Sequence, residues 1–148
     1  FISKLNAHHE SEHVYRGRYS DRGVTDKTHY PSSVHPLVAT HPISGRPTLY
    51  VNPSFTTRIE GLSKTESAAL LDLLFTHQSR LEFQTRFRWT PNSIALWDNR
   101  SAQHFAIWDY WPQPRQGHRV TIKGAAPVKG KQIDSKSYEN LRLSRSRL

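Results

Sequence analysis

The sequence predicts a mainly β domain, an antiparallel barrel or jelly roll with one inserted helix. Three observations support this fold class: candidate strands outnumber candidate helices, the connections are short and rich in turn residues, and only one stretch has strong helical periodicity. At 148 residues the chain suits a single domain. Its hydrophobic share of 35% is low for a globular protein, so we expect a modest core or one that a partner completes.

The first third of the chain is predicted to contain a helix end, a long loop and a hairpin. The opening stretch, "FISKLNAHHE", has apolar residues spaced as at the end of a helix. Residues 10–34 are polar without a sustained period, which is typical of a long loop. Residues 35–42 alternate as a strand does, 43–47 ("ISGRP") supply a turn, and 48–52 form the return strand.

The clearest helix is predicted over residues 62–79. Ser63 is followed three positions later by Glu66, the spacing of a capping box at a helix start. The apolar stripe that should face the core consists of Leu70, Leu71, Leu74 and Phe75.

Four further strands are predicted after this helix. Residues 81–89 alternate strictly, with Phe83, Thr85, Phe87 and Trp89 on one face and charged or amide side chains on the other. After a turn at "TPN", strands are expected over 93–98, 103–107 and 117–124.

Composition excludes several classes of protein. No run approaches the roughly 18 apolar residues of a membrane span, and nothing near the start resembles a signal peptide. The absence of cysteine excludes disulfides and thiolate metal sites and fits a cytoplasmic location. The chain has no methionine and opens within a predicted helix, so we expect it to be part of a longer protein.

The formal net charge of +9 favours anionic partners. Residues 125–148 hold six Lys and Arg residues against two acidic ones, so we expect a basic, flexible tail after a domain over 1–124. Binding to single-stranded nucleic acid is a weaker alternative, because most aromatic residues lie at alternating, core-like positions. Low apolar content and exposed strand edges favour a dimer or a larger homo-oligomer.

Three residues near the end of the predicted domain suggest a site. His104 lies on one predicted strand, and Arg115 and Arg119 follow on the next, four positions apart and therefore on one face. An imidazole can ligate a metal, and guanidinium groups bind carboxylate or sulfonate oxygens through two hydrogen bonds. By spacing alone, the more common interpretations are a structural histidine and a solvated arginine face.

Residues 35–62 and 83–124, which include "WDNRSAQHFAIWDYWPQPRQGHR", resemble the C-terminal half of the taurine dioxygenase family. This family includes 2,4-dichlorophenoxyacetate and alkylsulfatase dioxygenases, which are iron(II)- and 2-oxoglutarate-dependent oxygenases on a double-stranded β-helix, a jelly roll. The resemblance implies Fe(II), 2-oxoglutarate and O2 as cofactor and cosubstrates. It also implies a small anionic substrate: a sulfonate, a sulfate ester or a carboxylate.

Carried over by position, the resemblance gives roles to individual residues. His104 matches the distal iron-ligating histidine, and Arg115 matches the arginine that binds the far carboxylate of 2-oxoglutarate. Arg119 matches the arginine that faces the anionic group of the substrate, and Phe55 matches an aromatic residue against that substrate. Trp97 matches a tryptophan near the cosubstrate, although a core role fits it equally well, and His118 receives no role.

Two of the family's three iron ligands, from a His-x-Asp or His-x-Glu motif on an earlier strand, have no match. The chain contains no His-x-Asp, and its single His-x-Glu, at residues 8–10, lies after the motif's usual place. The threonine that shares 2-oxoglutarate binding is also upstream. We therefore expect the activity in a complete protein and none in this stretch alone; the alternative is a catalytically incomplete relative that binds anions through Arg115 and Arg119.

Overall fold

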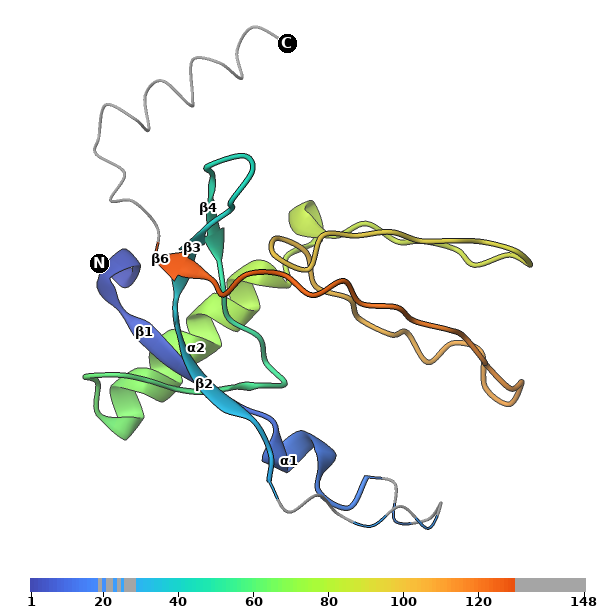
Figure 1. Ribbon diagram of the computed structural model, residues 1–148, viewed down its shortest axis with the longest axis horizontal. Coiled ribbons are helices and arrows are strands. Elements are labelled where there is room, and N and C mark those ends of the chain that lie inside the picture. Colours follow the sequence, from blue (N-terminus) through green and yellow to red (C-terminus); the bar gives the residue numbers. More distant parts are fainter. Residues whose placement is uncertain (19, 21–22, 24, 26–28, 130–148) are drawn as a thin grey trace, which may run out of the picture.

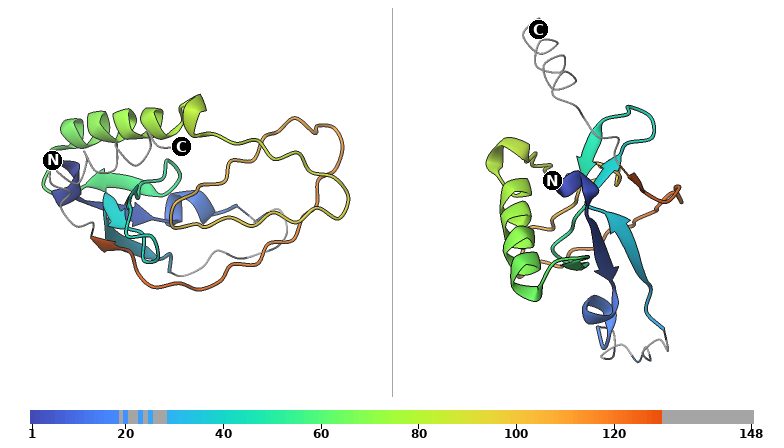
Figure 2. Two further views of the ribbon diagram at one scale, coloured as in Figure 1. Left: turned by 90° about the horizontal axis from the view of Figure 1, so that it is seen from above. Right: turned by 90° about the vertical axis from the view of Figure 1, so that its left-hand side faces the viewer.

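The computed structural model describes residues 1–18, 20, 23, 25 and 29–129. These residues form two three-stranded antiparallel sheets and one long helix (Figure 1). The helix lies along one side of the strands in both views of Figure 2, while the chain between residues 84 and 127 extends away from this body as long arms. The prediction of strands with one long helix is confirmed. The described strands form two separate small sheets rather than one closed barrel.

The first sheet is centred on β1 (Asn6–Glu10), which pairs with β2 (Ser32–Pro36) and β5 (Thr56–Ile59). The prediction of a helix end at this point is wrong. Only Ile2–Lys4 form a single 3-10 turn (η1), and β1 then satisfies its backbone groups on both edges. Long-range pairing outweighs local preference here, since histidine and asparagine favour helices only weakly.

The predicted loop over residues 10–34 is interrupted by regular structure. A single-turn helix, α1 (Glu12–Tyr15), follows β1, and strand β2 begins at Ser32. The rest of the loop lies partly outside the described residues.

The second sheet contains the predicted hairpin, which is confirmed. Strand β3 (Val38–Thr40) pairs with β4 (Pro47–Leu49) in the register Val38↔Leu49 to Thr40↔Pro47. Gly45 permits the turn because its φ is +67°, a region that favours glycine. The opposite edge of β3 carries β6 (Val128–Lys129), a short strand within the segment expected to be a tail.

The predicted helix and its cap are confirmed as α2 (Lys64–Gln78). The Ser63 hydroxyl accepts from the Glu66 backbone N–H at 3.3 Å, and the Glu66 carboxylate accepts from the Ser63 N–H at 2.9 Å. Leu71 and Leu74 join the buried core, and Leu70 and Phe75 pack against it half-buried. The other buried members of this core, all from the strands and their ends, are Ala7, Leu37, Val51 and Ile59.

The prediction of four strands after the helix is wrong. The structure has no strand at residues 81–89, 93–98, 103–107 or 117–124. Leu81–Phe83 form a 3-10 turn (η3), and residues 84–127 contain no strand. Their apolar side chains face solvent: Leu96 is 93% exposed, Val120 91% and Phe105 86%. A strand requires a hydrogen-bonded neighbour, and in the described part of the chain these extended stretches have none. Alternation therefore identifies a face suited to burial but does not create the sheet that buries it.

No helix in the described part of the chain is long and apolar enough to cross a membrane.

Candidate functional site

A hollow of about 220 Å³ opens where the strand ends meet the turn that carries His104. One wall comes from β1, the end of β4 and the loop before β5, and the other comes from residues 99–104. The lining residues are His9, Leu49, Tyr50, Val51, Asn52, Phe55, Asn99, Arg100, Ser101, Ala102, Gln103 and His104.

The structure brings two of the four predicted site residues to this hollow. His104 and Phe55, which lie 49 positions apart in the sequence, both line it. The ring of Trp97 stacks on the imidazole of His104, with 5.3 Å between ring centroids and 18° between ring planes. Trp97 is therefore a neighbour of His104 rather than part of the buried core.

The two predicted anion-binding arginines lie elsewhere. Arg115 and Arg119 are exposed on the arm that follows His104, and neither lines the hollow. The guanidinium of Arg115 lies over the ring of Tyr110, 5.5 Å from its centroid, a cation–π contact. His118 is exposed on the same arm.

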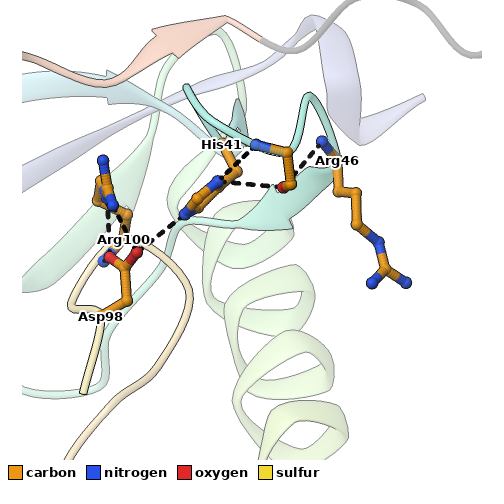
Figure 3. Close-up of polar contacts among 5 residues, drawn as sticks. His41, Arg46, Asp98 and Arg100 are labelled. Atoms are coloured by element: carbon orange, nitrogen blue, oxygen red, sulfur yellow. Dashed lines mark hydrogen bonds and ion pairs between the residues drawn. The ribbon is translucent and has the colours of Figure 1, made fainter. Parts of the chain in front are cut away.

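A short turn at residues 98–102 holds the His104 wall in place. The backbone carbonyl of Asp98 accepts from the N–H groups of Ser101 (3.1 Å) and Ala102 (2.9 Å). Its carboxylate accepts two bonds from the Arg100 side chain, at 2.8 and 2.6 Å, and one from the Arg100 backbone N–H at 2.9 Å. A further contact of 2.9 Å joins the carboxylate to His41 Nε2 (Figure 3). The hydrogen bonds from Arg100, followed by that from His41, hold the pKa of Asp98 far below its usual range.

Gln103 forms a second anchor, directly before His104. Its Nε2 donates to the carbonyl oxygen of Val51 at 2.6 Å, and its Oε1 accepts from the Asn52 amide at 3.2 Å. The same Nε2 lies 3.4 Å from Gln78 Oε1 at the end of α2. His104 therefore follows a residue that is bonded to the opposite wall of the hollow.

On that opposite wall, His9 is kept neutral by its surroundings. Burial, followed by the neighbouring imidazoles of His35 and His8, lowers the pKa of His9 to about 4. Its Nδ1 lies 3.3 Å from the Thr56 hydroxyl, and its Nε2 is buried without a hydrogen-bond partner. The rings of His9, His35 and Tyr50 contact one another with centroid distances of 5.3 to 5.7 Å.

The described residues do not by themselves fit the iron site that the family resemblance implies. A facial triad needs two histidines and one carboxylate around a single point. Nowhere in residues 1–18, 20, 23, 25 and 29–129 do three such side chains come together. In the His-x-Glu sequence, His8 is already paired with Glu60, 3.1 Å from Nε2, and with Arg58, 3.2 Å from Nδ1. Among the described residues, His104 is the position that the family resemblance matches to an iron ligand, and no second His, Asp or Glu joins it in a three-residue cluster.

Sequence reasoning missed Asn52, Gln103 and the His41–Asp98 contact. Asn52 and Gln103, which line the hollow, do have a sequence signal. Asn52 is a polar residue at the end of the predicted hairpin, and Gln103 is a polar residue directly before His104. The His41–Asp98 contact joins residues 57 positions apart and has no local signal.

Comparison with known proteins places these features in a family. Residues 1–121 match the model of the family described as "Taurine catabolism dioxygenase TauD, TfdA family". The chain is 40% identical over 134 residues to an alpha-ketoglutarate-dependent sulfate ester dioxygenase of Pseudomonas putida, covering 84% of this chain and 44% of that protein. It is 34% identical over 131 residues to an alpha-ketoglutarate-dependent sulfonate dioxygenase of Saccharomyces cerevisiae, covering 86% of this chain and 31% of that protein.

An alkylsulfatase of Acinetobacter baylyi is 31% identical over 162 residues, covering all of this chain and 50% of that protein. A crystal structure of a taurine dioxygenase from Burkholderia xenovorans is 37% identical, with a TM-score of 0.47, over 61% of this chain and 27% of that chain. The chain thus spans half or less of the length of these relatives. With the match extending from residue 1 to residue 121 of 148, this chain belongs to the TauD/TfdA family of dioxygenases.

Proposed function

We propose that this chain supplies part of the active site of an Fe(II)- and 2-oxoglutarate-dependent dioxygenase that hydroxylates a small anionic organic substrate. A sulfate ester or a sulfonate is the favoured substrate, and a carboxylate is the remaining, less favoured class. The observation that carries the proposal is the 40% identity over 134 residues to a sulfate ester dioxygenase. A sulfonate dioxygenase at 34% identity supports the same substrate class.

The geometry of the hollow supports roles for two residues within this proposal. His104, which lines the hollow, is the proposed iron ligand, and Phe55, which lines it too, is the proposed apolar contact for the substrate. Arg115 is proposed to bind the far carboxylate of 2-oxoglutarate, and Arg119 the anionic group of the substrate. Guanidinium groups suit both tasks because they bind oxyanions through paired hydrogen bonds.

The remaining parts of the site must come from polypeptide other than the described residues. We propose that the two missing iron ligands lie on strands that pair with the extended stretches within residues 84–124 and complete a jelly roll. On this basis the 148-residue chain alone is inactive. Assembly as a homo-oligomer and a cytoplasmic location are further parts of the proposal.

The test is turnover by the protein expressed from its entire reading frame. With Fe(II), 2-oxoglutarate and O2, we expect an alkyl sulfate or an alkanesulfonate to stimulate succinate formation and the release of sulfate or sulfite. Arg119→Gln should reduce the stimulation by substrate much more than it reduces the slow 2-oxoglutarate decarboxylation that occurs without substrate. Arg115→Gln should raise the KM for 2-oxoglutarate. His29→Gln, at an exposed histidine that does not line the hollow, is the control. Absence of succinate formation with every sulfate, sulfonate and carboxylate tested would refute the proposal.

A catalytically incomplete anion-binding protein is the second candidate. It is favoured by the lack of a three-ligand cluster among the side chains that the structure describes. Calorimetry with 2-oxoglutarate and with an alkanesulfonate, both without metal, distinguishes the two. Binding that needs Arg115 and Arg119 but is unaffected by Fe(II), together with no turnover, would favour the anion-binding protein.

A further inference from the structure

The turn that carries His104 is attached to the body of the protein through a residue from a distant hairpin. His41 follows β3 directly and closes the β3–β4 turn, donating its backbone N–H to Arg46 O at 2.9 Å and accepting from Gly45 N–H at 2.8 Å. Its imidazole points from this turn to Asp98 (Figure 3). His41 is thus fixed by its own hairpin before it contacts the His104 segment.

The surroundings of His41 determine which ring nitrogen carries the hydrogen. The backbone N–H of Ser44 donates to Nδ1 at 3.1 Å, so this nitrogen must present a lone pair. The hydrogen therefore lies on Nε2, which donates to Asp98 Oδ2 at 2.9 Å. The side chain of His41 is 12% exposed and that of Asp98 is 37% exposed, so the contact is buried on the histidine side and open to water on the carboxylate side.

The Asp98 carboxylate then connects His41 to the whole turn. Each carboxylate oxygen accepts from Arg100, and one of them also accepts from His41. The segment from Trp97 to His104 is consequently attached at two points, Asp98 to His41 and Gln103 to Val51. The stack of Trp97 on His104 joins the two ends of the segment, each directly outside one of these anchors.

The exposed arms make these anchors important. Leu96, just before the segment, is 93% exposed, and Phe105, just after it, is 86% exposed. Neither flank is packed well enough to position His104. The orientation of its imidazole therefore depends on the contacts that residues 97–104 make with one another and with His41 and Val51.

We propose that His41 is a positioning residue for His104: its Nε2–H fixes the Asp98–Arg100 pair and thereby the turn that presents the His104 imidazole at the hollow. The relevance of this to metal binding rests on the proposed function. The positioning itself is a property of the chain without metal and can be measured separately.

The test compares His41→Asn with His41→Gln in the full chain by NMR. The Gln amide can place an N–H group near the position of Nε2, whereas the Asn amide reaches only to the position of Nδ1. In the wild-type protein we expect the ¹⁵N shifts of His41 to show the Nε2–H tautomer. The His104 Cε1–H signal, assigned by its loss in His104→Gln, should be shifted upfield by the stacked ring of Trp97.

In His41→Asn, exchange of the Ser101 and Ala102 amides should accelerate about tenfold or more, as for the loss of one hydrogen bond to a charged group. The upfield shift of His104 should also be lost. His41→Gln should restore much of both signals, and His29→Gln should match the wild type. Amides of α2 serve as the internal reference for local rather than global change.

Three results would overturn the proposal: an Nδ1–H tautomer of His41 in the wild type, unchanged His104 and Ala102 signals in His41→Asn, or equal losses in the Asn and Gln variants. If His41→Asn unfolds entirely, the proposal is still tested by the tautomer of His41 in the wild type and by the His104 and Ala102 signals of His41→Gln. Because no step requires iron or turnover, failure of the proposed dioxygenase activity leaves this test intact. If the enzyme is active but the His104 signal is unchanged in His41→Asn, the positioning role is refuted and the proposed function is not.

Discussion

Replacing Gln103 with Glu tests whether the second anchor of the His104 turn is a hydrogen bond or only a packing contact. The two side chains have nearly the same shape, but an ionised Glu places an oxygen where Gln103 Nε2 now donates to Val51 O at 2.6 Å. The acceptor bond from Asn52 can persist, since a carboxylate accepts as well as an amide oxygen does. The change therefore removes one donor and keeps most of the packing.

The expected cost follows from the burial of the acceptor. Val51 is only 1% exposed, so its carbonyl loses a partner that water replaces poorly. An unsatisfied buried acceptor costs about 1–3 kcal/mol, and the repulsion between the two oxygens acts in the same direction. The free energy of opening the turn should fall by this amount, which is roughly a 5- to 150-fold increase in amide exchange.

Exchange of the Ala102 amide, which donates to Asp98 O at 2.9 Å, reports this opening. The same substitution at Gln113, an exposed residue on the arm, introduces the same charge and should leave Ala102 unchanged. The reasoning is refuted if Gln103→Glu exchanges at the wild-type rate. It is equally refuted if the amides of α2 accelerate to the same extent, because the effect would then be global.

Three further predictions concern the body of the protein. Leu37→Ala removes a fully buried side chain and should lower the free energy of unfolding in urea by about 2–5 kcal/mol; a shift within error would contradict the assigned core. Ser63→Ala should cost about 0.5–2 kcal/mol in thermal unfolding, and Glu66→Gln should cost less because it keeps the reciprocal bond of the capping box. The free energy of unfolding should fall as the pH decreases from about 6.5 to about 4, because the unfolded chain protonates His9 in this range and the folded chain does not. His9→Gln should flatten that part of the pH profile, and an unaltered profile would show that His9 does not cause it.

Local signals predicted the parts of the fold that local contacts determine. The capping box at Ser63 and Glu66 fixes the start of α2, and the turn around Gly45 fixes the β3–β4 hairpin, so both were confirmed. Strand β1 was missed because its pattern, "NAHHE", is neither apolar nor alternating. It is a strand because β2 and β5 pair with both of its edges, and β2 lies more than 20 residues away in sequence.

The strands predicted after α2 failed for the converse reason. Residues 81–89 have the alternation of a strand, but alternation requires a neighbouring strand before it yields a sheet. The site shows the same division. The family resemblance identified His104 and Phe55, which do share the hollow, whereas the His41–Asp98 contact depends on how the chain returns upon itself and has no sequence pattern.

The pairing of β6 with β3 has a consequence for the order in which the protein assembles. Strand β3 meets β4 across a short turn, but the Thr40 hydroxyl reaches the Lys129 carbonyl across 89 residues of chain. Closing so long a loop costs more entropy than closing a hairpin, and the two-residue strand β6 repays little of it. We therefore expect β6 to dock last and to detach first, so that strengthening it would slow unfolding while leaving the folding rate nearly unchanged.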